Sequence, residues 1–320
     1  MNDIINKINM LRKEKNAVIL AHNYQLPEVQ DIADFVGDSL GLSIQASKTK
    51  ARLIVFCGVR FMAETAAIIC PDKKVIMPDV NAGCPMADMI TPDDVRKLRA
   101  EHPGAIVVAY VNTSAEVKAE SDYCCTSANA VKVVEKLSAE GARLPDGQGS
   151  ASGGTNKEII FIPDKYLGDY VSKQTGKKLI LFNGYCPSHV KILPEHIQAV
   201  KKEHPDALIM AHPECLPDVI AMADKVASTG GMIKFAKESQ AGEFIIGTEV
   251  GIIHRLQKEN PGKIFYPATN LAVCPNMKKT TLEKVLWALE DEQSIITVPE
   301  NIAEKARIAI NRMLEISRMD

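Results

Sequence analysis

The sequence lacks long hydrophobic runs and has no large excess of charge of either sign. No stretch approaches the ~18 consecutive apolar residues that a membrane-spanning helix requires. A net charge of −2 over 320 residues provides no basic stripe for nucleic acid. We therefore expect neither a membrane nor a nucleic-acid partner.

The N-terminal segment has no pattern of a secretory signal. Charged residues between Asp3 and Lys15 interrupt the apolar residues Ile4, Ile5 and Ile8, which predicts an amphipathic surface helix instead. The chain contains eight cysteines. Without an export signal, these indicate reduced thiols and metal or redox chemistry rather than a disulfide framework, and we expect a cytoplasmic enzyme.

A threefold internal repeat spans most of the chain. The apolar segment at residues 17–22, Ala-Val-Ile-Leu-Ala-His, has counterparts 88 residues later at 105–110 and 190 residues later at 207–212. Length alone would suggest about two domains, but a repeated pattern is the stronger evidence for architecture. The sequence therefore predicts three similar units.

Three cysteines occupy equivalent positions near the end of each unit, and each is followed by proline: Cys84, Cys186 and Cys274. The first and last are 190 residues apart, which matches the repeat, whereas Cys84 and Cys186 are 102 apart. The second unit therefore has an insertion of 14 residues. A Gly/Ser-rich stretch at residues 145–154 accounts for it, and we predict a surface loop there.

The pattern in each unit predicts strands alternating with helices. In the first unit we expect strands at residues 17–21, 53–56 and 75–77, a helix from Pro27 through Val36, a second helix capped by Ser39, and a third around Met62. Near-continuous apolar strands between helices indicate parallel sheets covered on both faces, a three-layer α/β fold. We place the units at residues 1–90, 91–192 and 193–278, followed by two C-terminal helices at 279–320 that pack back on the core.

Polar residues follow the first strand of every unit, where ligands bind in parallel sheets. The three triplets are His22-Asn23-Tyr24, Tyr110-Val111-Asn112 and His212-Pro213-Glu214. They would converge if the units surround a pseudo-threefold axis. Satisfied core polar groups are the plainer interpretation of such residues, but matched positions in three repeats favour a cleft.

Hydroxyl residues also recur in register, at the next helix start of each unit: Ser39, Ser127 and Thr229. As plain N-caps they would be structural. Free N–H groups and hydroxyls at a helix start also bind phosphate or carboxylate, and both roles are compatible.

The three matched cysteines predict a metal site assembled from all three units. Their separations exclude a local zinc-finger spacing. The remaining five cysteines are expected to include several ordinary buried residues: Cys57, Cys70, Cys124, Cys125 and Cys215. His189 could complete a zinc site, but three thiolates fit better with a 4Fe-4S cluster that leaves one iron open.

Taken together, these motifs resemble the quinolinate synthase family of de novo NAD biosynthesis over nearly the whole length. Besides the triplets and cysteines, Gly37-Asp38-Ser39, Ser228-Thr229-Gly230 and Gly247-Thr248-Glu249 carry the resemblance. It implies three α/β domains in a triangle around a central cavity, with a 4Fe-4S cluster held by Cys84, Cys186 and Cys274. Some members carry a Cys-x-x-Cys-x-x-Cys run at the last ligand, whereas Pro275-Asn276-Met277-Lys278 follows Cys274 here, so redox regulation through such a run is not expected.

The implied reaction condenses iminosuccinate with dihydroxyacetone phosphate to quinolinate, with loss of phosphate and two waters. L-aspartate oxidase or aspartate dehydrogenase would supply the iminosuccinate. The open iron would act as a Lewis acid. We expect Glu214 to be the general base, His212 to bind phosphate or a substrate oxygen, and Tyr24 to donate a hydrogen bond or proton. The expected substrate-binding residues are His22, Ser39, Tyr110, Asn112, Ser127, His212, Glu214 and Thr229.

Two alternatives stay open at this point. One is a different 4Fe-4S hydro-lyase acting on another small hydroxy acid. The other is a non-enzymatic iron-sulfur sensor, for which the charge pattern offers no interaction surface.

Overall fold

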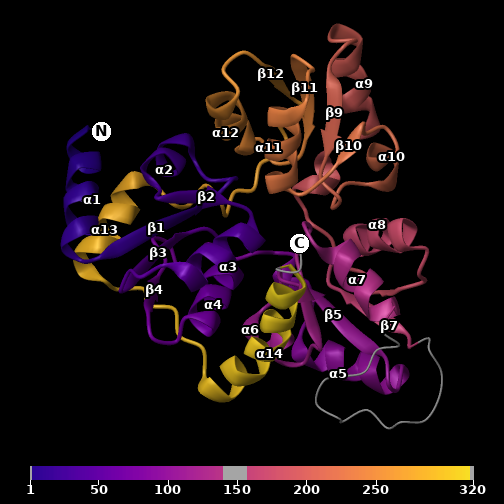
Figure 1. Cartoon of the computed structure of the whole chain (residues 1–320), viewed down its shortest axis with the longest axis horizontal. Helices are drawn as coiled ribbons and strands as arrows, with labels where there is room; N and C mark the ends of the chain where they lie inside the picture. The colour runs from indigo at the N-terminus through magenta and orange to yellow at the C-terminus, as the bar shows by residue number, and fades with distance from the viewer. Residues whose placement is uncertain (1, 140–156, 318–320) are drawn as a thin grey trace. The chain divides into compact units, whose positions relative to one another are not determined.

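The computed structural model describes residues 2–139 and 157–317 (Figure 1). The chain divides into two compact units. The first unit combines Met1–Pro85 with Cys186–Val298, and the second combines Met86–Tyr185 with Pro299–Asp320. The predicted loop at residues 145–154 lies outside the described residues. The four domain ranges and the triangular arrangement predicted from the sequence stay predictions.

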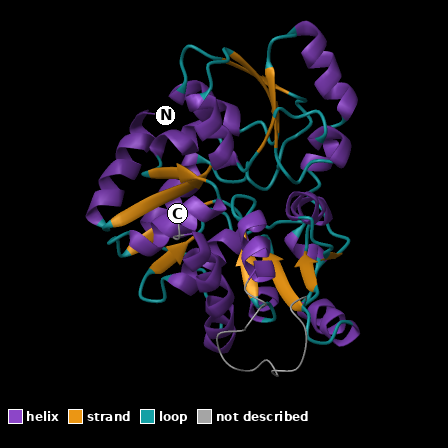
Figure 2. Cartoon of the chain, turned by 45° about the vertical axis from the view of Figure 1, so that its right-hand side comes forward, coloured by secondary structure: helices purple, strands orange, loops and turns teal. Residues whose placement is uncertain are grey.

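Each repeat contains one four-stranded, all-parallel sheet, and the three sheets share one strand order (Figure 2). The orders are β2-β1-β3-β4, β6-β5-β7-β8 and β10-β9-β11-β12. The predicted fold class, three similar α/β repeats, is thus confirmed. The strands are β1 Ala17–His22, β2 Phe35–Gly37, β3 Leu53–Cys57, β4 Lys74–Ile76, β5 Ile106–Tyr110, β6 Tyr123–Cys125, β7 Ile159–Ile162, β8 Ile180–Leu181, β9 Leu208–Ala211, β10 Lys225–Val226, β11 Glu243–Gly247 and β12 Ile264–Pro267.

Helices connect the strands and cover the sheets, as expected for parallel connections. They are α1 Asn2–Glu14, α2 Pro27–Ile32, α3 Ser39–Lys48, α4 Arg60–Ile69, α5 Pro92–Glu101, α6 Ala115–Ala119, α7 Ala130–Ala139, α8 Lys165–Thr175, α9 Pro194–Glu203, α10 Pro217–Ile220, α11 Thr229–Glu238, α12 Ile252–Glu259, α13 Leu282–Asp291 and α14 Glu300–Ser317, with short 3-10 turns η1 Ala87–Met89 and η2 His189–Lys191. In the described part of the chain, no helix has the length and apolar character that crossing a membrane requires.

The prediction of one helix from Pro27 to Val36 is wrong. Helix α2 ends at Ile32, because Ala33 adopts an extended conformation, and residues 35–37 form β2 beside β1. The Asp34 carboxylate accepts a hydrogen bond of 2.8 Å from the Ile19 amide, which anchors the chain where it enters the new strand. Helical spacing of apolar residues had hidden a short edge strand.

The two C-terminal helices return to different sheets. Helix α13 packs against α1 and β3 in the first unit, and its buried residues join the core of the first sheet. Helix α14 packs against α6 and β6 in the second unit. The predicted pair of terminal helices and the amphipathic N-terminal helix α1 are confirmed.

Candidate active site and metal centre

The first unit brings the first and third polar triplets to the carboxyl ends of β1 and β9. Both strands lie inside their sheets, beside the point where the strand order reverses. The two turns are built alike: the Tyr24 amide donates to His22 Nδ1 at 3.2 Å, and the Glu214 amide donates to His212 Nδ1 at 3.4 Å. The repeat therefore extends from the strand order to the local geometry of these turns. They lie at the carboxyl ends of the strands, where parallel sheets commonly bind ligands.

A continuous chain of polar contacts joins the two triplets. The Tyr24 hydroxyl lies 2.6 Å from Thr248 Oγ1, which lies 2.8 Å from His189 Nε2. On its other side, His189 Nδ1 lies 2.8 Å from Glu214 Oε2 and 3.1 Å from the Cys186 sulfur. All of these side chains except Cys186 are more than nine-tenths buried, so the contacts are shielded from water and electrostatically strong.

Burial sets the protonation of the aromatic and imidazole groups. Burial, with the neighbouring histidine as a lesser cause, lowers the pKa of His22 to about 3. Burial likewise lowers the pKa of His212 to about 3. Both imidazoles are therefore neutral near pH 7. Burial and the Glu214 carboxylate raise the pKa of Tyr24 well above its usual value, so that its phenol stays protonated and can donate.

Two of the three matched cysteines lie in identical turns. Backbone N–H groups of His189 and Ser188 bond the Cys186 sulfur, and the sulfur of Cys274 receives the corresponding bonds from the residues two and three positions further on. Such N–H···S bonds favour the thiolate, which is the metal-binding form. Burial nevertheless raises the pKa of both thiols, so a nearby cation is what would make thiolates favourable here.

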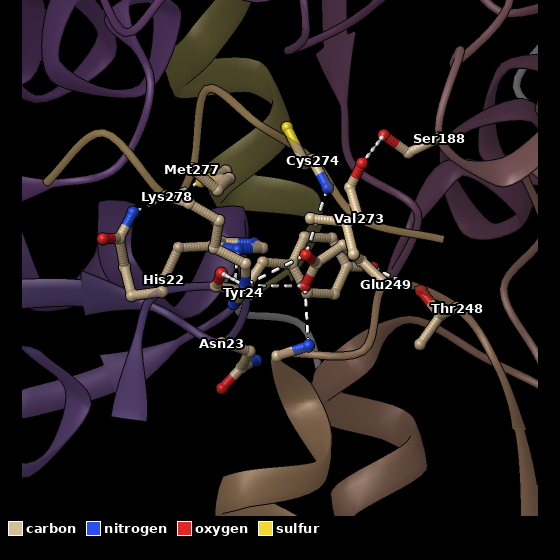
Figure 3. Close-up of polar contacts among 12 residues, drawn as sticks. His22, Asn23, Tyr24, Ser188, Thr248, Glu249, Val273, Cys274, Met277 and Lys278 are labelled. Carbon is tan, nitrogen blue, oxygen red and sulfur yellow. Dashed lines mark hydrogen bonds and ion pairs between the residues drawn. The ribbon is translucent and has the colours of Figure 1, made fainter. Parts of the chain in front are cut away.

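All three matched cysteines belong to the first unit, and two contacts relate them. The Cys84 thiol lies near enough to that of Cys186 to contribute to its raised pKa. The turns of Cys186 and Cys274 are tied directly, because the Ser188 hydroxyl donates to the Val273 carbonyl at 3.2 Å (Figure 3). Together the three positions offer soft sulfur donors of the kind that iron-sulfur clusters and zinc select.

The other five cysteines are all buried, whereas Cys84, Cys186 and Cys274 are partly exposed. The expectation that several of the five are ordinary buried residues is thus confirmed, whereas the assignment of the other three as metal ligands stays a prediction. Burial of the adjacent pair Cys124 and Cys125 follows from strand β6, whose successive side chains point to opposite, covered faces.

Cys186, His189 and Glu214 form a group whose potential ligand atoms all lie within 4.8 Å of one another. A sulfur, an imidazole nitrogen and a carboxylate oxygen at this separation suit a transition metal. The residues present therefore fit a metal centre.

The predicted caps are shifted by one residue. Asp38 and Ser228 are the N-caps of α3 and α11, and they accept from the amides of Gly41 and Gly231. Ser39 and Thr229 are the first residues inside the helices. In the third repeat this leaves the Thr229 hydroxyl to accept a 2.8 Å hydrogen bond from Asn23 of the first triplet.

The second triplet and Ser127 belong to the second compact unit. Tyr110 ends β5, and its carbonyl accepts a hydrogen bond from the Thr113 hydroxyl at 3.2 Å. Asn112 Oδ1 is buried without a hydrogen-bond partner in the described residues. Ser127 lies in the turn that precedes α7. Membership of these residues in one site with the first unit stays a prediction.

Three functional candidates beyond the predicted set come from the loops after β11 and after Cys274. Thr248 and Glu249 follow β11 directly, and Lys278 lies four residues past Cys274. The Glu249 carboxylate lies between the Cys274 amide and the Lys278 ammonium (Figure 3). Thr248 and Glu249 could have been predicted, because functional residues commonly lie at the carboxyl ends of parallel strands. Lys278 has no such signal, because its role depends on tertiary contact.

A family model described as "NadA: Quinolinate synthetase A protein" matches residues 6–315. The chain belongs to this family. Among curated relatives named quinolinate synthase, one from Dehalococcoides mccartyi is 53% identical over 313 residues, with 98% of both chains covered. Another from Methanosarcina barkeri is 51% identical over 314 residues at the same coverage, and one from Thermodesulfovibrio yellowstonii is 52% identical over 317 residues, covering 99% of both.

Membership of the quinolinate synthase family makes this chain an enzyme of that type. Together with the group formed by Cys186, His189 and Glu214, it also points to a metal cofactor. The contact chain from Tyr24 through Thr248 reaches this group at His189.

Proposed function

We propose that this protein is a quinolinate synthase that condenses iminosuccinate with dihydroxyacetone phosphate to quinolinate, with loss of phosphate and two waters, in de novo NAD biosynthesis. The observation that carries the proposal is the buried chain from Tyr24 through Thr248 and His189 to Glu214, beside cysteine turns suited to metal. Similarity over the full length to relatives that bear this name supports it.

The proposed cofactor is a 4Fe-4S cluster held by Cys84, Cys186 and Cys274. With three protein ligands, one iron stays open, and the bound cluster supplies a Lewis acid that polarises a substrate oxygen. The sulfur donors, the N–H···S bonds at two of them and the proximity of Cys84 to Cys186 support this ligand set.

Three side chains of the first unit carry the proposed proton transfers. Glu214 abstracts protons in the carbon-acid and dehydration steps, since it is the carboxylate nearest the cysteine turns that also contacts an imidazole. His212 is neutral and binds a phosphate or substrate oxygen. Tyr24 keeps its proton and donates it, or a hydrogen bond, to a developing oxyanion.

The remaining predicted residues would hold the carboxylates and the phosphate. They are His22, Ser39 and Thr229 of the first unit, and Tyr110, Asn112 and Ser127 of the second. Free N–H groups at the starts of α3 and α11 favour anions, so that no arginine is needed. The unpartnered Oδ1 of Asn112 supports a ligand contact there, because buried polar atoms are normally hydrogen-bonded.

We further propose the cellular setting. L-aspartate oxidase or aspartate dehydrogenase would supply iminosuccinate. The cytoplasm suits the chain because thiol ligands need a reducing compartment. The three α/β domains would close in a triangle around the central cavity, with the domain ranges predicted from the sequence.

Anaerobic purification followed by iron and sulfide analysis and a quinolinate assay tests the proposal. Near four irons and four sulfides per chain, with quinolinate formed from both substrates, is the expected result. A cluster without quinolinate would refute the substrates, and one zinc without labile sulfide would refute the cofactor.

A further inference from the structure

Glu249 is a fully buried carboxylate with an unusual set of donors. Its Oε1 accepts from the Cys274 amide at 3.1 Å and lies 3.0 Å from Lys278 Nζ. Its Oε2 accepts from the Gly251 amide at 2.7 Å and from Lys278 Nζ at 3.3 Å. The carboxylate therefore fixes the main chain at Cys274 as well as pairing with a charge.

Lys278 extends this arrangement to the first repeat. Besides its contacts with Glu249, its ammonium donates to the backbone carbonyl of Tyr24. The neighbouring Thr248 binds the Tyr24 hydroxyl. Two adjacent residues of one loop thus hold Tyr24 at both ends, one directly and one through Lys278 (Figure 3).

The pair leaves no room for a side chain at Gly251. A Cβ placed on Gly251 would lie 2.6 Å from Lys278 Nζ and 2.9 Å from the Tyr24 carbonyl carbon. The Gln30 side-chain amide donates to the carbonyls of Gly251 at 2.9 Å and Asn23 at 3.2 Å, which ties the same two loops from the other side.

A buried ion pair is weak evidence for stability, since desolvation offsets the attraction, and it is better explained where it fixes one conformation. We propose that Glu249 and Lys278 are a positioning pair that holds the main chain of Cys274 and the backbone of Tyr24 in one fixed arrangement. The pair thereby sets the geometry between a metal ligand and a proton-donating phenol. This rests on the proposed function, in which Cys274 binds the cluster and Tyr24 donates.

Three variants of the full-length, anaerobically purified protein test the pair. Glu249→Gln keeps the size but replaces one acceptor oxygen by an NH2 donor, so that the Cys274 and Gly251 amides share one neutral acceptor oxygen between them. Gly251→Ala crowds Lys278 Nζ, Glu249 Oε2 and the Tyr24 carbonyl carbon, which would lie 2.6, 2.8 and 2.9 Å from the added Cβ, without any change of charge. Glu292→Gln is the matched control for Glu249→Gln, because Glu292 also pairs with a lysine, Lys74, at 2.9 Å in the same unit.

Three measurements are made on each variant. Hydrogen exchange in peptides that contain Cys274 and Gly251 should become about 10-fold faster or more in Glu249→Gln, because both backbone amides lose the charged acceptor and one of them then faces a donor. The electron paramagnetic resonance signal of the reduced cluster should change. The kcat per bound cluster should fall about 10- to 100-fold in Glu249→Gln and Gly251→Ala, as for residues that orient metal ligands, with KM changing less.

Unchanged exchange and resonance signals with kcat within twofold of wild type would overturn the proposal. So would an activity that falls only in proportion to iron content, since the pair would then merely retain the cluster. If wild type itself lacks a cluster or makes no quinolinate, the proposed function fails, whereas the exchange measurement still decides whether Glu249 fixes Cys274.

Discussion

Replacing Tyr24 by phenylalanine removes one hydroxyl from the centre of the site. That hydroxyl contacts Thr248 Oγ1 at 2.6 Å and lies 3.5 Å from His189 Nε2. Thr248 keeps its 2.8 Å contact with His189 after the change, so no partner is left without a hydrogen bond. The ring stays in its T-shaped contact with His22, with centroids 4.6 Å apart.

The effects on stability and on rate should differ widely in size. Loss of one neutral hydrogen bond with its partner still satisfied costs about 1 kcal/mol of unfolding free energy. Loss of a proton donor to the transition state lowers the rate about 10²- to 10⁴-fold, or roughly 3–5 kcal/mol in the barrier. The Tyr24→Phe variant should therefore fold and bind its cluster normally but turn over slowly.

The assay is steady-state quinolinate formation per bound cluster, with thermal unfolding measured on the same samples. Tyr266→Phe is the control, because the Tyr266 hydroxyl also makes a side-chain hydrogen bond, to Glu243, while its ring stacks on His204 away from the triplets. It should keep its rate within about twofold. A rate for Tyr24→Phe equal to that of the control would remove Tyr24 from the mechanism.

Three further outcomes are expected. Glu214→Gln should retain iron and lower kcat by about 10²-fold or more; a rate near wild type, measured as quinolinate per cluster, would exclude Glu214 as the base. Cys186→Ser should abolish the visible absorbance of the cluster, whereas Cys57→Ala, which changes a buried structural cysteine, should keep it; absorbance retained in Cys186→Ser would refute the ligand set. Lys74 and Arg52 lower the pKa of Glu292 to about 2 in the folded state, below its ordinary 4.5. In urea unfolding, the extra stability of wild type over Glu292→Gln should therefore be complete above pH 4.5 and vanish as the pH falls toward 2. A stability difference that does not vary with pH would contradict this.

Much of the architecture could be read from the chain because the signals were local. The apolar strands of each repeat predicted three parallel sheets, and the Cys-Pro dipeptides at equivalent repeat positions singled out the three cysteines that are partly exposed. The short strand at Phe35–Gly37 escaped, because three residues with helix-like spacing do not reveal an edge strand. Only its pairing with β1 in the folded structure identifies it as a strand.

The chemistry of the site could be predicted only in part. His22, Tyr24, His212 and Glu214 stood out because they interrupt apolar strand ends at matched positions. The contacts that join them depend on loops from other repeats. His189 appeared in the sequence only as a possible zinc ligand, yet it lies between Thr248, Glu214 and Cys186.

Two of the candidate ligands, Cys84 and Cys186, lie where the chain leaves and re-enters the first compact unit. The first compact unit is interrupted after Pro85 and resumes at Cys186, so Cys84 and Cys186 flank the intervening segment Met86–Tyr185. A metal bound to both would close a loop of about a hundred residues. By the chain-entropy relation for cross-links, closing such a loop raises the free energy of the unfolded chain by about 4.7 kcal/mol. A cofactor bound to both cysteines would then contribute to the free energy of unfolding, and its loss would lower the stability of the fold as well as stop the chemistry.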